Sequence, residues 1–199
     1  MDLPRLAADQ KKAQRLKAHV VFIDESGLLM APVLQRTWSP VGKTPILSQR
    51  TRAHQKVSAI AALSMAPDRR RLRLLFRLHR DINIDGPVVT DFLRQLLRQL
   101  PGSLMLIWDR WSVHRSQSVT TWRCGQPRLM VEWLPPYAPE LNPVEQVWGY
   151  LKCHPLANWA PPDSATLATV ARAHGRALQR QPSLLRAFCQ HTPLPFDFQ

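Results

Sequence analysis

Short apolar runs bounded by polar residues recur through the first two thirds of the chain. Residues 20–23 (Val-Val-Phe-Ile) and 104–108 (Leu-Met-Leu-Ile-Trp) are two such runs. Runs of this length are typical of buried strands. Residues 71–78 instead alternate Leu or Phe with Arg, which indicates a strand with one exposed face. The predicted strands are 19–26, 28–38, 56–64, 71–78, 103–109 and 128–134.

Helical spacing of apolar residues begins after the turn Asp85-Gly86-Pro87 and stops at Pro101-Gly102. The predicted helices are 88–100, 113–123, one beginning at Asn142-Pro143, 163–180 and 183–190. Three antiparallel strands, a crossover helix, a parallel strand, a helix, another strand and a helix are the order of an RNase H-like domain. We therefore predict the α/β class, with a mixed five-stranded sheet and flanking helices.

Length and composition favour one domain with a proper core, because 45% of the 199 residues are hydrophobic. We divide the chain into three parts. These are a basic helical or linker segment (1–18), an RNase H-like catalytic domain (19–155), and a C-terminal helical extension packed on the same domain (156–199).

Three carboxylates stand where such a fold would bring them together. Asp24 ends the first apolar run, Asp109 ends the second, and Glu145 lies one turn into the helix announced by Asn142-Pro143. Acids at the ends of buried strands point toward the sheet edge, where ligands gather. Three acids in one place repel each other unless cations occupy the site. The pattern therefore indicates a magnesium site.

The rest of the chain is strongly basic, with a formal net charge of +13 and a sequence pI near 11.0. Such a field favours a polyanionic partner, above all nucleic acid. No apolar stretch approaches the roughly 20 residues of a membrane span. Three widely separated cysteines support neither a zinc site nor a disulfide framework. A cytoplasmic protein without a membrane partner is expected.

Four segments resemble the mariner-like superfamily of DDE transposases, in particular its bacterial insertion-sequence branch. The most specific is 134–152, LPPYAPELNPVEQVWGYLK. Segments 21–26 (VFIDES), 107–114 (IWDRWSVH) and 36–45 (RTWSPVGKTP) agree with it. The resemblance covers about residues 19–153.

The resemblance implies a catalytic domain for cut-and-paste DNA transposition, with Asp24, Asp109 and Glu145 as catalytic metal ligands. It implies two Mg²⁺ ions, with Mn²⁺ as a substitute, and a homodimer acting on double-stranded DNA at transposon ends and target. Relatives carry helix-turn-helix modules before this domain, and about 18 residues precede the first strand here. We expect an upstream module in cis or in trans, or a truncated gene product.

Several further residues are candidates for DNA contact or an auxiliary role. Arg110 follows the second acid, where relatives often carry Asn. It could hold a scissile phosphate or compete with the metal for Asp109. The Arg-rich stretch 69–80 is a solvated face or a phosphate track. The complete set of candidates is Arg110, His114, Arg115, Trp38, Lys43, Asn142 and Lys152.

Structural interpretations compete at some of these positions. Asn142 and Glu145 also suit a helix N-cap and its N3 partner. Glu25 is interpreted as a strand-ending turn residue that faces away from Asp24, and Trp148 as a core residue. For the whole chain, the alternatives are a silent DNA-binding remnant and an RNase H-like structure-specific nuclease.

Overall fold

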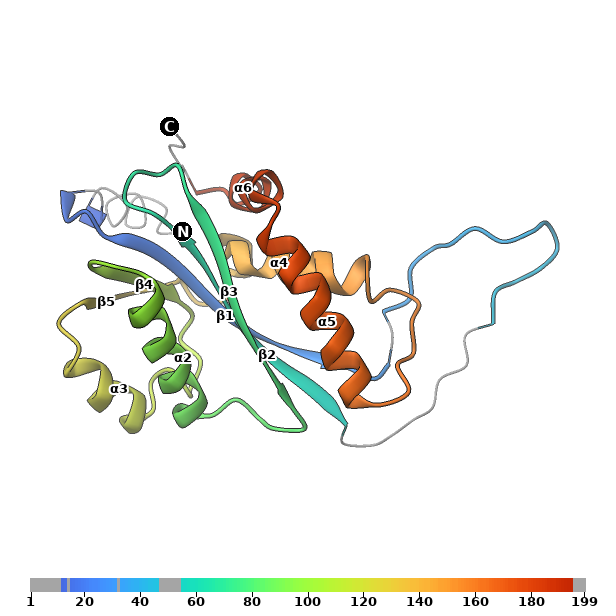
Figure 1. Ribbon diagram of the computed structural model, residues 1–199, viewed down its shortest axis with the longest axis horizontal. Helices are drawn as coiled ribbons and strands as arrows, with labels where there is room; N and C mark the ends of the chain where they lie inside the picture. The colour runs from blue at the N-terminus through green and yellow to red at the C-terminus, as the bar shows by residue number, and fades with distance from the viewer. Residues whose placement is uncertain (1–11, 14, 32, 47–54, 195–199) are drawn as a thin grey trace.

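The computed structural model describes residues 12–13, 15–31, 33–46 and 55–194, and its centre is one mixed sheet (Figure 1). The strands pair in the order β3-β2-β1-β4-β5. β1 pairs antiparallel with β2 and parallel with β4, so the middle of the sheet joins both kinds of pairing. The strand bounds are His19–Leu29 (β1), Lys56–Met65 (β2), Leu72–Arg80 (β3), Leu104–Trp108 (β4) and Leu129–Trp133 (β5).

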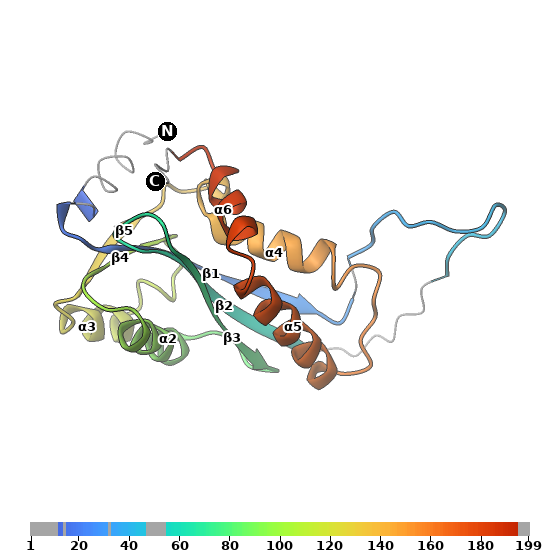
Figure 2. The same cartoon turned by 45° about the horizontal axis from the view of Figure 1, so that its top comes forward.

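Helices cover both faces of this sheet (Figure 2). Helices α2 and α3 pack on one face and contribute to one apolar cluster. Helices α4 and α6, with the C-terminal end of α5, pack on the other face in a second cluster. The helix bounds are Gly86–Gln99 (α2), Gln117–Cys124 (α3), Pro143–Cys153 (α4), Ser164–Gln179 (α5) and Pro182–Gln190 (α6), with a 3₁₀ turn η1 at Pro139–Leu141.

Strand alternation decides which helices each β1 side chain meets. Val20 and Phe22 belong to the cluster with α4 and α6, whereas Val21 and Ile23 belong to the cluster with α2 and α3. All four are fully or almost fully buried, as the continuous apolar run predicts. The same alternation, continued past Ile23, sends successive polar side chains to opposite faces.

The predicted second strand, 28–38, is wrong. Leu28 and Leu29 still belong to β1, where they pair with Val57 and Lys56. The described residues 33–46 form no strand and project away from the sheet (Figure 1, light blue). All of them are exposed, so the segment has no surface to bury its apolar side chains against. Two prolines, Pro40 and Pro45, also lack the N–H that a ladder requires.

The other predicted elements agree with the structure to within a few residues. The predicted segment 1–18 lies mostly outside the described residues. No helix in the described part of the chain is long and apolar enough to cross a membrane. Cys124, Cys153 and Cys189 are free, as expected.

Candidate active site

The three acids line one pocket of about 380 Å³. The β1–β4 ladder ends at the pair Phe22↔Ile107, so β1 continues past its neighbour and Asp24 lies just beyond the last pair. Asp109 follows the last residue of β4, and Glu145 lies in the first turn of α4. The sheet edge and one helix end thus bring together residues that are far apart in the sequence.

Asp24 is the most strongly perturbed of the three acids. Burial, followed by the nearby charges of Glu145 and Glu25, raises its pKa from 3.8 to about 8. One interaction opposes this rise, because Trp148 Nε1 donates a hydrogen bond to Asp24 Oδ2 at 2.8 Å. A carboxyl group in this state gains stability from any cation that binds beside it.

Asp109 is held by a buried histidine. His114 is 1% exposed, and its ring lies parallel to that of Trp108 with the centroids 4.2 Å apart. Its Nδ1 lies 2.9 Å from Asp109 Oδ1 and its Nε2 lies 3.1 Å from Glu25 Oε1. The two carboxylates outweigh burial and raise the pKa of His114 to about 9. The hydrogen bond from His114 in turn is the main cause that lowers the pKa of Asp109.

Glu145 is positioned by the start of α4. Asn142 caps this helix by accepting a hydrogen bond from Val144 N at 3.2 Å, and its Nδ2 donates to the carbonyl of Ile23 at 3.0 Å. The cap therefore ties α4 to β1 directly beside Asp24. Burial is the main cause that raises the pKa of Glu145, and Lys152 opposes it.

Asn142 is 2% exposed, and its side-chain amide makes its hydrogen bonds within the protein. Both ring nitrogens of His114 likewise contact carboxylates. For these two candidates the structure favours a supporting role over direct DNA contact.

The remaining candidates occupy different places. Arg110 is exposed and lines the acidic pocket, whereas Arg115 is exposed outside it. Trp38, 99% exposed, and Lys43 lie on the projecting segment 33–46. Lys152 donates to Ser26 Oγ at 2.7 Å.

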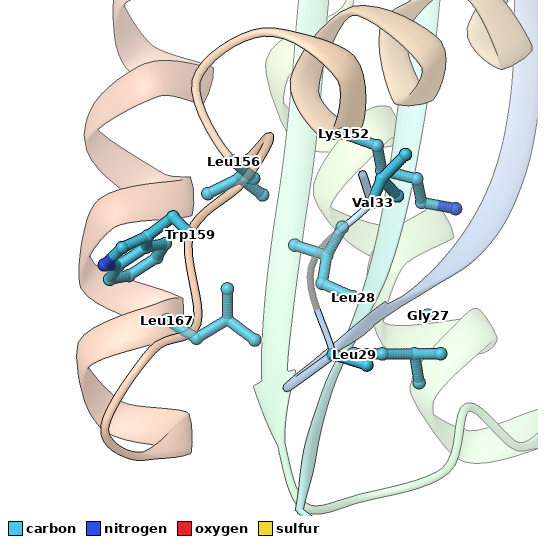
Figure 3. Close-up of a pocket in the computed structure, with 9 residues that line it drawn as sticks. Gly27, Leu28, Leu29, Val33, Lys152, Leu156, Trp159 and Leu167 are labelled. Carbon is cyan, nitrogen blue, oxygen red and sulfur yellow. The ribbon is translucent and has the colours of Figure 1, made fainter. Parts of the chain in front are cut away.

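Lys152 also borders a separate apolar pocket of about 120 Å³ at the end of β1 (Figure 3). Leu28, Leu156, Trp159 and Leu167 line this pocket with it. It shares no lining residue with the acidic pocket.

The donor set of the acidic pocket suits a hard divalent cation, which prefers carboxylate oxygens. Asp24 Oδ2 and Asp109 Oδ1 are each engaged by a protein donor. Among the hydrogen bonds found in the described part of the chain, none involves Asp24 Oδ1 or Asp109 Oδ2. In the arrangement shown, however, no group of three His, Cys, Asp or Glu side chains within the described ranges is close enough to hold a metal ion.

Two functional side chains escaped sequence reasoning. Trp148 is buried as predicted, but its indole N–H makes it a partner of Asp24 as well as a core residue. Glu25 faces away from Asp24 as predicted, since its partner is His114 on the other face. The strand-ending assignment of Glu25 is wrong, because β1 continues through its pair with Ile60. His114, five residues after the second acid, was the only signal for the Glu25 contact, and the Trp148 contact left none in the local sequence.

The fold is that of RNase H-like transposase catalytic domains. A Mos1 mariner paired-end complex with Mn matches with a TM-score of 0.65 and 14% identity, over 96% of this chain and 57% of that chain. A Mos1 paired-end complex with Mg gives 0.62 and 15%, over 95% and 57%. The separate Mos1 catalytic domain gives 0.50 and 13%, over 98% and 92%.

The sequence places the chain more specifically. Residues 19–168 match the family described as DDE superfamily endonuclease. The chain belongs to this family. It spans less than two thirds of the Mos1 chains in these two complexes. A search of curated proteins finds no match to it.

Proposed function

We propose that the chain is the catalytic domain of a cut-and-paste DNA transposase, with Asp24, Asp109 and Glu145 as the ligands of its divalent ions. The observation that carries this proposal is the convergence of the three acids, from β1, β4 and α4, on one pocket. Family membership supports the same chemistry. Mg²⁺ is the proposed cofactor, in two copies, and Mn²⁺ its substitute.

Divalent ions, when bound, stabilise the charge on the attacking and leaving oxygens of a phosphodiester displacement. The protein's own part is to present carboxylate oxygens in fixed positions. Trp148 and His114 each hold one oxygen of an acid, which orients the other toward the pocket. Arg110, on the wall of the same pocket, is suited to a scissile phosphate. The Asp109 carboxylate already has an ion pair with His114, so it does not need Arg110 as a partner.

The proposed partner is double-stranded DNA at transposon ends and target. The net charge of +13 supports it, and a solved Mos1 relative is a paired-end complex with the left transposon end. We also propose a homodimer, an additional helix-turn-helix module in cis or in trans, and a cytoplasmic, nucleoid-associated location. Assignment to the bacterial insertion-sequence branch stays a prediction.

A single substitution, Asp109→Asn, tests the catalytic role. Cleavage of duplex DNA in Mg²⁺ should fall by several orders of magnitude, because a metal ligand is lost. DNA affinity should stay equal or rise, because a negative charge near phosphate is removed. Glu140→Gln is the matched control: it removes an exposed carboxylate next to the pocket that does not line it.

The outcomes distinguish a catalytic domain from a silent DNA-binding remnant. An Asp109→Asn variant that cuts at the rate of the unsubstituted chain would refute the assignment of this acid. An unsubstituted chain that binds DNA and cleaves none, in Mg²⁺ or Mn²⁺, would instead identify the silent DNA-binding remnant.

A further inference from the structure

A further hollow, of about 430 Å³, lies between the edge strand β3 and helix α5. β2 separates β3 from β1, so this hollow is apart from the acidic pocket, and the two share no lining residue. No acid occurs among the described residues that line it. They are Phe76, Arg77, Leu78, His79, Arg172, Arg176 and Gln179.

Helix α5 is fixed against β3 at three points. Near its start, Ser164 Oγ donates to Asp81 Oδ2 at 2.7 Å, and at its end Gln179 Nε2 donates to the carbonyl of Leu74 at 2.8 Å. Between them Gly175 meets the ring of Phe76 so closely that an added Cβ would lie 2.6 Å from Phe76 Cζ. The hollow between strand and helix is therefore a preformed feature of the packing.

The exposed arginine side chains at the hollow come from helix α5. Arg172 and Arg176 are exposed and one helical turn apart on α5, and Arg180 continues their row at the same spacing. On β3, Arg77 also lines the hollow, but its Nε donates to Gln95 Oε1 of α2 at 2.5 Å, so its guanidinium is held toward the α2 face of the sheet. None of the ion pairs found among the described residues involves Arg172, Arg176 or Arg180, so these charges are available to an external anion.

His79 adds polarity to the hollow but no charge. Burial, followed by the charge of Arg77, lowers its pKa, so it is neutral at pH 7. Its Nε2 is buried without a hydrogen-bond partner within the described structure. The positive field at the hollow thus comes from the arginines.

We propose that this hollow and the α5 arginine row (Arg172, Arg176, Arg180) bind the phosphate backbone of duplex DNA, as a contact surface separate from the acidic pocket. The row rises about 12 Å along the helix, which is the axial length of roughly three to four nucleotides of one strand. Guanidinium groups suit phosphate oxygens because they donate in a fixed fork. An added β-strand is the less suited occupant, since Gln179 already occupies the Leu74 carbonyl at this edge.

The proposal concerns DNA binding and rests on the proposed function only for the identity of the polyanion. Its test measures binding in EDTA, where no metal-dependent cleavage occurs. The variant is Arg172→Ala with Arg176→Ala. The control is Arg94→Ala with Arg98→Ala, which removes two exposed arginines at the same helical spacing from α2, on the opposite face of the sheet.

Affinity for a 30-base-pair duplex of arbitrary sequence is measured against salt concentration for each protein. Loss of two phosphate contacts should reduce the slope of log K against log salt by about 1.8, because each contact contributes about 0.9. The α2 control should keep the slope of the unsubstituted chain. Thermal unfolding should differ little among the three, since the four arginines are exposed and the surface ion pair of Arg94 with Asp91 contributes less than about 1 kcal/mol.

Two results would overturn the proposal. If the α5 pair leaves the slope unchanged, the row does not contact phosphate. If both pairs reduce the slope equally, attraction is spread over the whole basic surface and no particular site exists. Neither result bears on cleavage at the acidic pocket, and loss of cleavage in the Asp109 variant would not alter this slope.

Discussion

Replacing Asp24 by Asn should make the metal-free protein more stable while it abolishes cleavage. Burial and two nearby acids make the ionised Asp24 costly, as its pKa of about 8 reflects. An amide at this position carries no charge. Its oxygen can still accept the hydrogen bond that Trp148 donates. The substitution thus removes the repulsion between Asp24 and the nearby acids, and it keeps the packing and the hydrogen bond to Trp148 of α4.

The magnitude follows from linkage between folding and protonation. A rise in pKa from 3.8 to about 8 is four pKa units, which at 1.4 kcal/mol per unit corresponds to an upper limit of ~6 kcal/mol. Water in the pocket and small movements of the neighbouring acids reduce this cost, so we expect a gain of about 2 kcal/mol. For a chain of this size that is a rise of roughly 4 to 8 °C in Tm.

The direction of the Asp24 pKa shift determines the pH range in which the substitution affects stability. Asp24 binds its proton more tightly when folded, so the folded state of the unsubstituted chain loses stability as pH rises from about 4 to about 8. The gain from Asp24→Asn should therefore be near zero at pH 4, grow through this window and be complete above pH 8. Urea unfolding in EDTA at several pH values measures it.

Two controls sharpen this experiment. Asp91→Asn removes a carboxylate from an exposed ion pair with Arg94 and should change stability by less than about 1 kcal/mol at any pH. Addition of Mg²⁺ at pH 8 should stabilise the unsubstituted chain and leave the Asp24 variant unaffected. A variant that is less stable than the unsubstituted chain at pH 8, or whose effect does not vary with pH, would refute the reasoning.

Three further outcomes are expected. Trp148→Phe should lower cleavage 10- to 100-fold at limiting Mg²⁺, with partial recovery at high Mg²⁺, because the tie to the first acid is lost; Trp159→Phe should have no such effect. Gly175→Ala should cost about 1–3 kcal/mol in urea unfolding, because the new Cβ would collide with Phe76, and an unchanged midpoint would contradict the close packing. Trp38→Ser should weaken binding to duplex DNA without lowering Tm, since Trp38 is 99% exposed on the projecting segment, and an unaltered affinity would remove this residue from the candidates for DNA contact.

The sheet was predictable because its strands bury one or both faces, and burial leaves a pattern in the sequence. The run 20–23 and the alternation in 71–78 indicated β1 and β3 directly. The segment 28–38 misled because its apolar residues differ in burial. Leu28 and Met30 are buried, whereas Leu34 and Trp38 are exposed, so the pattern beyond the end of β1 reflects no packing. Leu75 also shows the limit of alternation, since it is buried against the α2 face while the other apolar residues of β3 meet the other face.

The three acids were predictable for a different reason. Asp24 and Asp109 end apolar runs, and in a mixed sheet such ends meet at one edge, while Glu145 follows a recognisable helix start. The side chains that contact these acids were not predictable, because each contact joins distant parts of the chain. Trp148 lies 124 positions from Asp24, and His114 lies 89 positions from Glu25. Local sequence indicated a core tryptophan and left the role of His114 open, and only the register of β1 against β4 and α4 reveals their partners.

The placement of these donors explains how a strongly basic protein maintains a cluster of acids without neutralising it. A lysine or arginine paired with each carboxylate would stabilise the fold, but it would also compete with any cation. Here Trp148 donates a neutral N–H to one oxygen of Asp24, and His114 shares its charge between Asp109 and Glu25. Asp24 is thereby oriented without a cationic partner in the described part of the chain, and burial together with Glu145 and Glu25 keeps its pKa high. The instability that remains is relieved when a cation binds, so the same repulsion that weakens the metal-free fold favours occupation of the site.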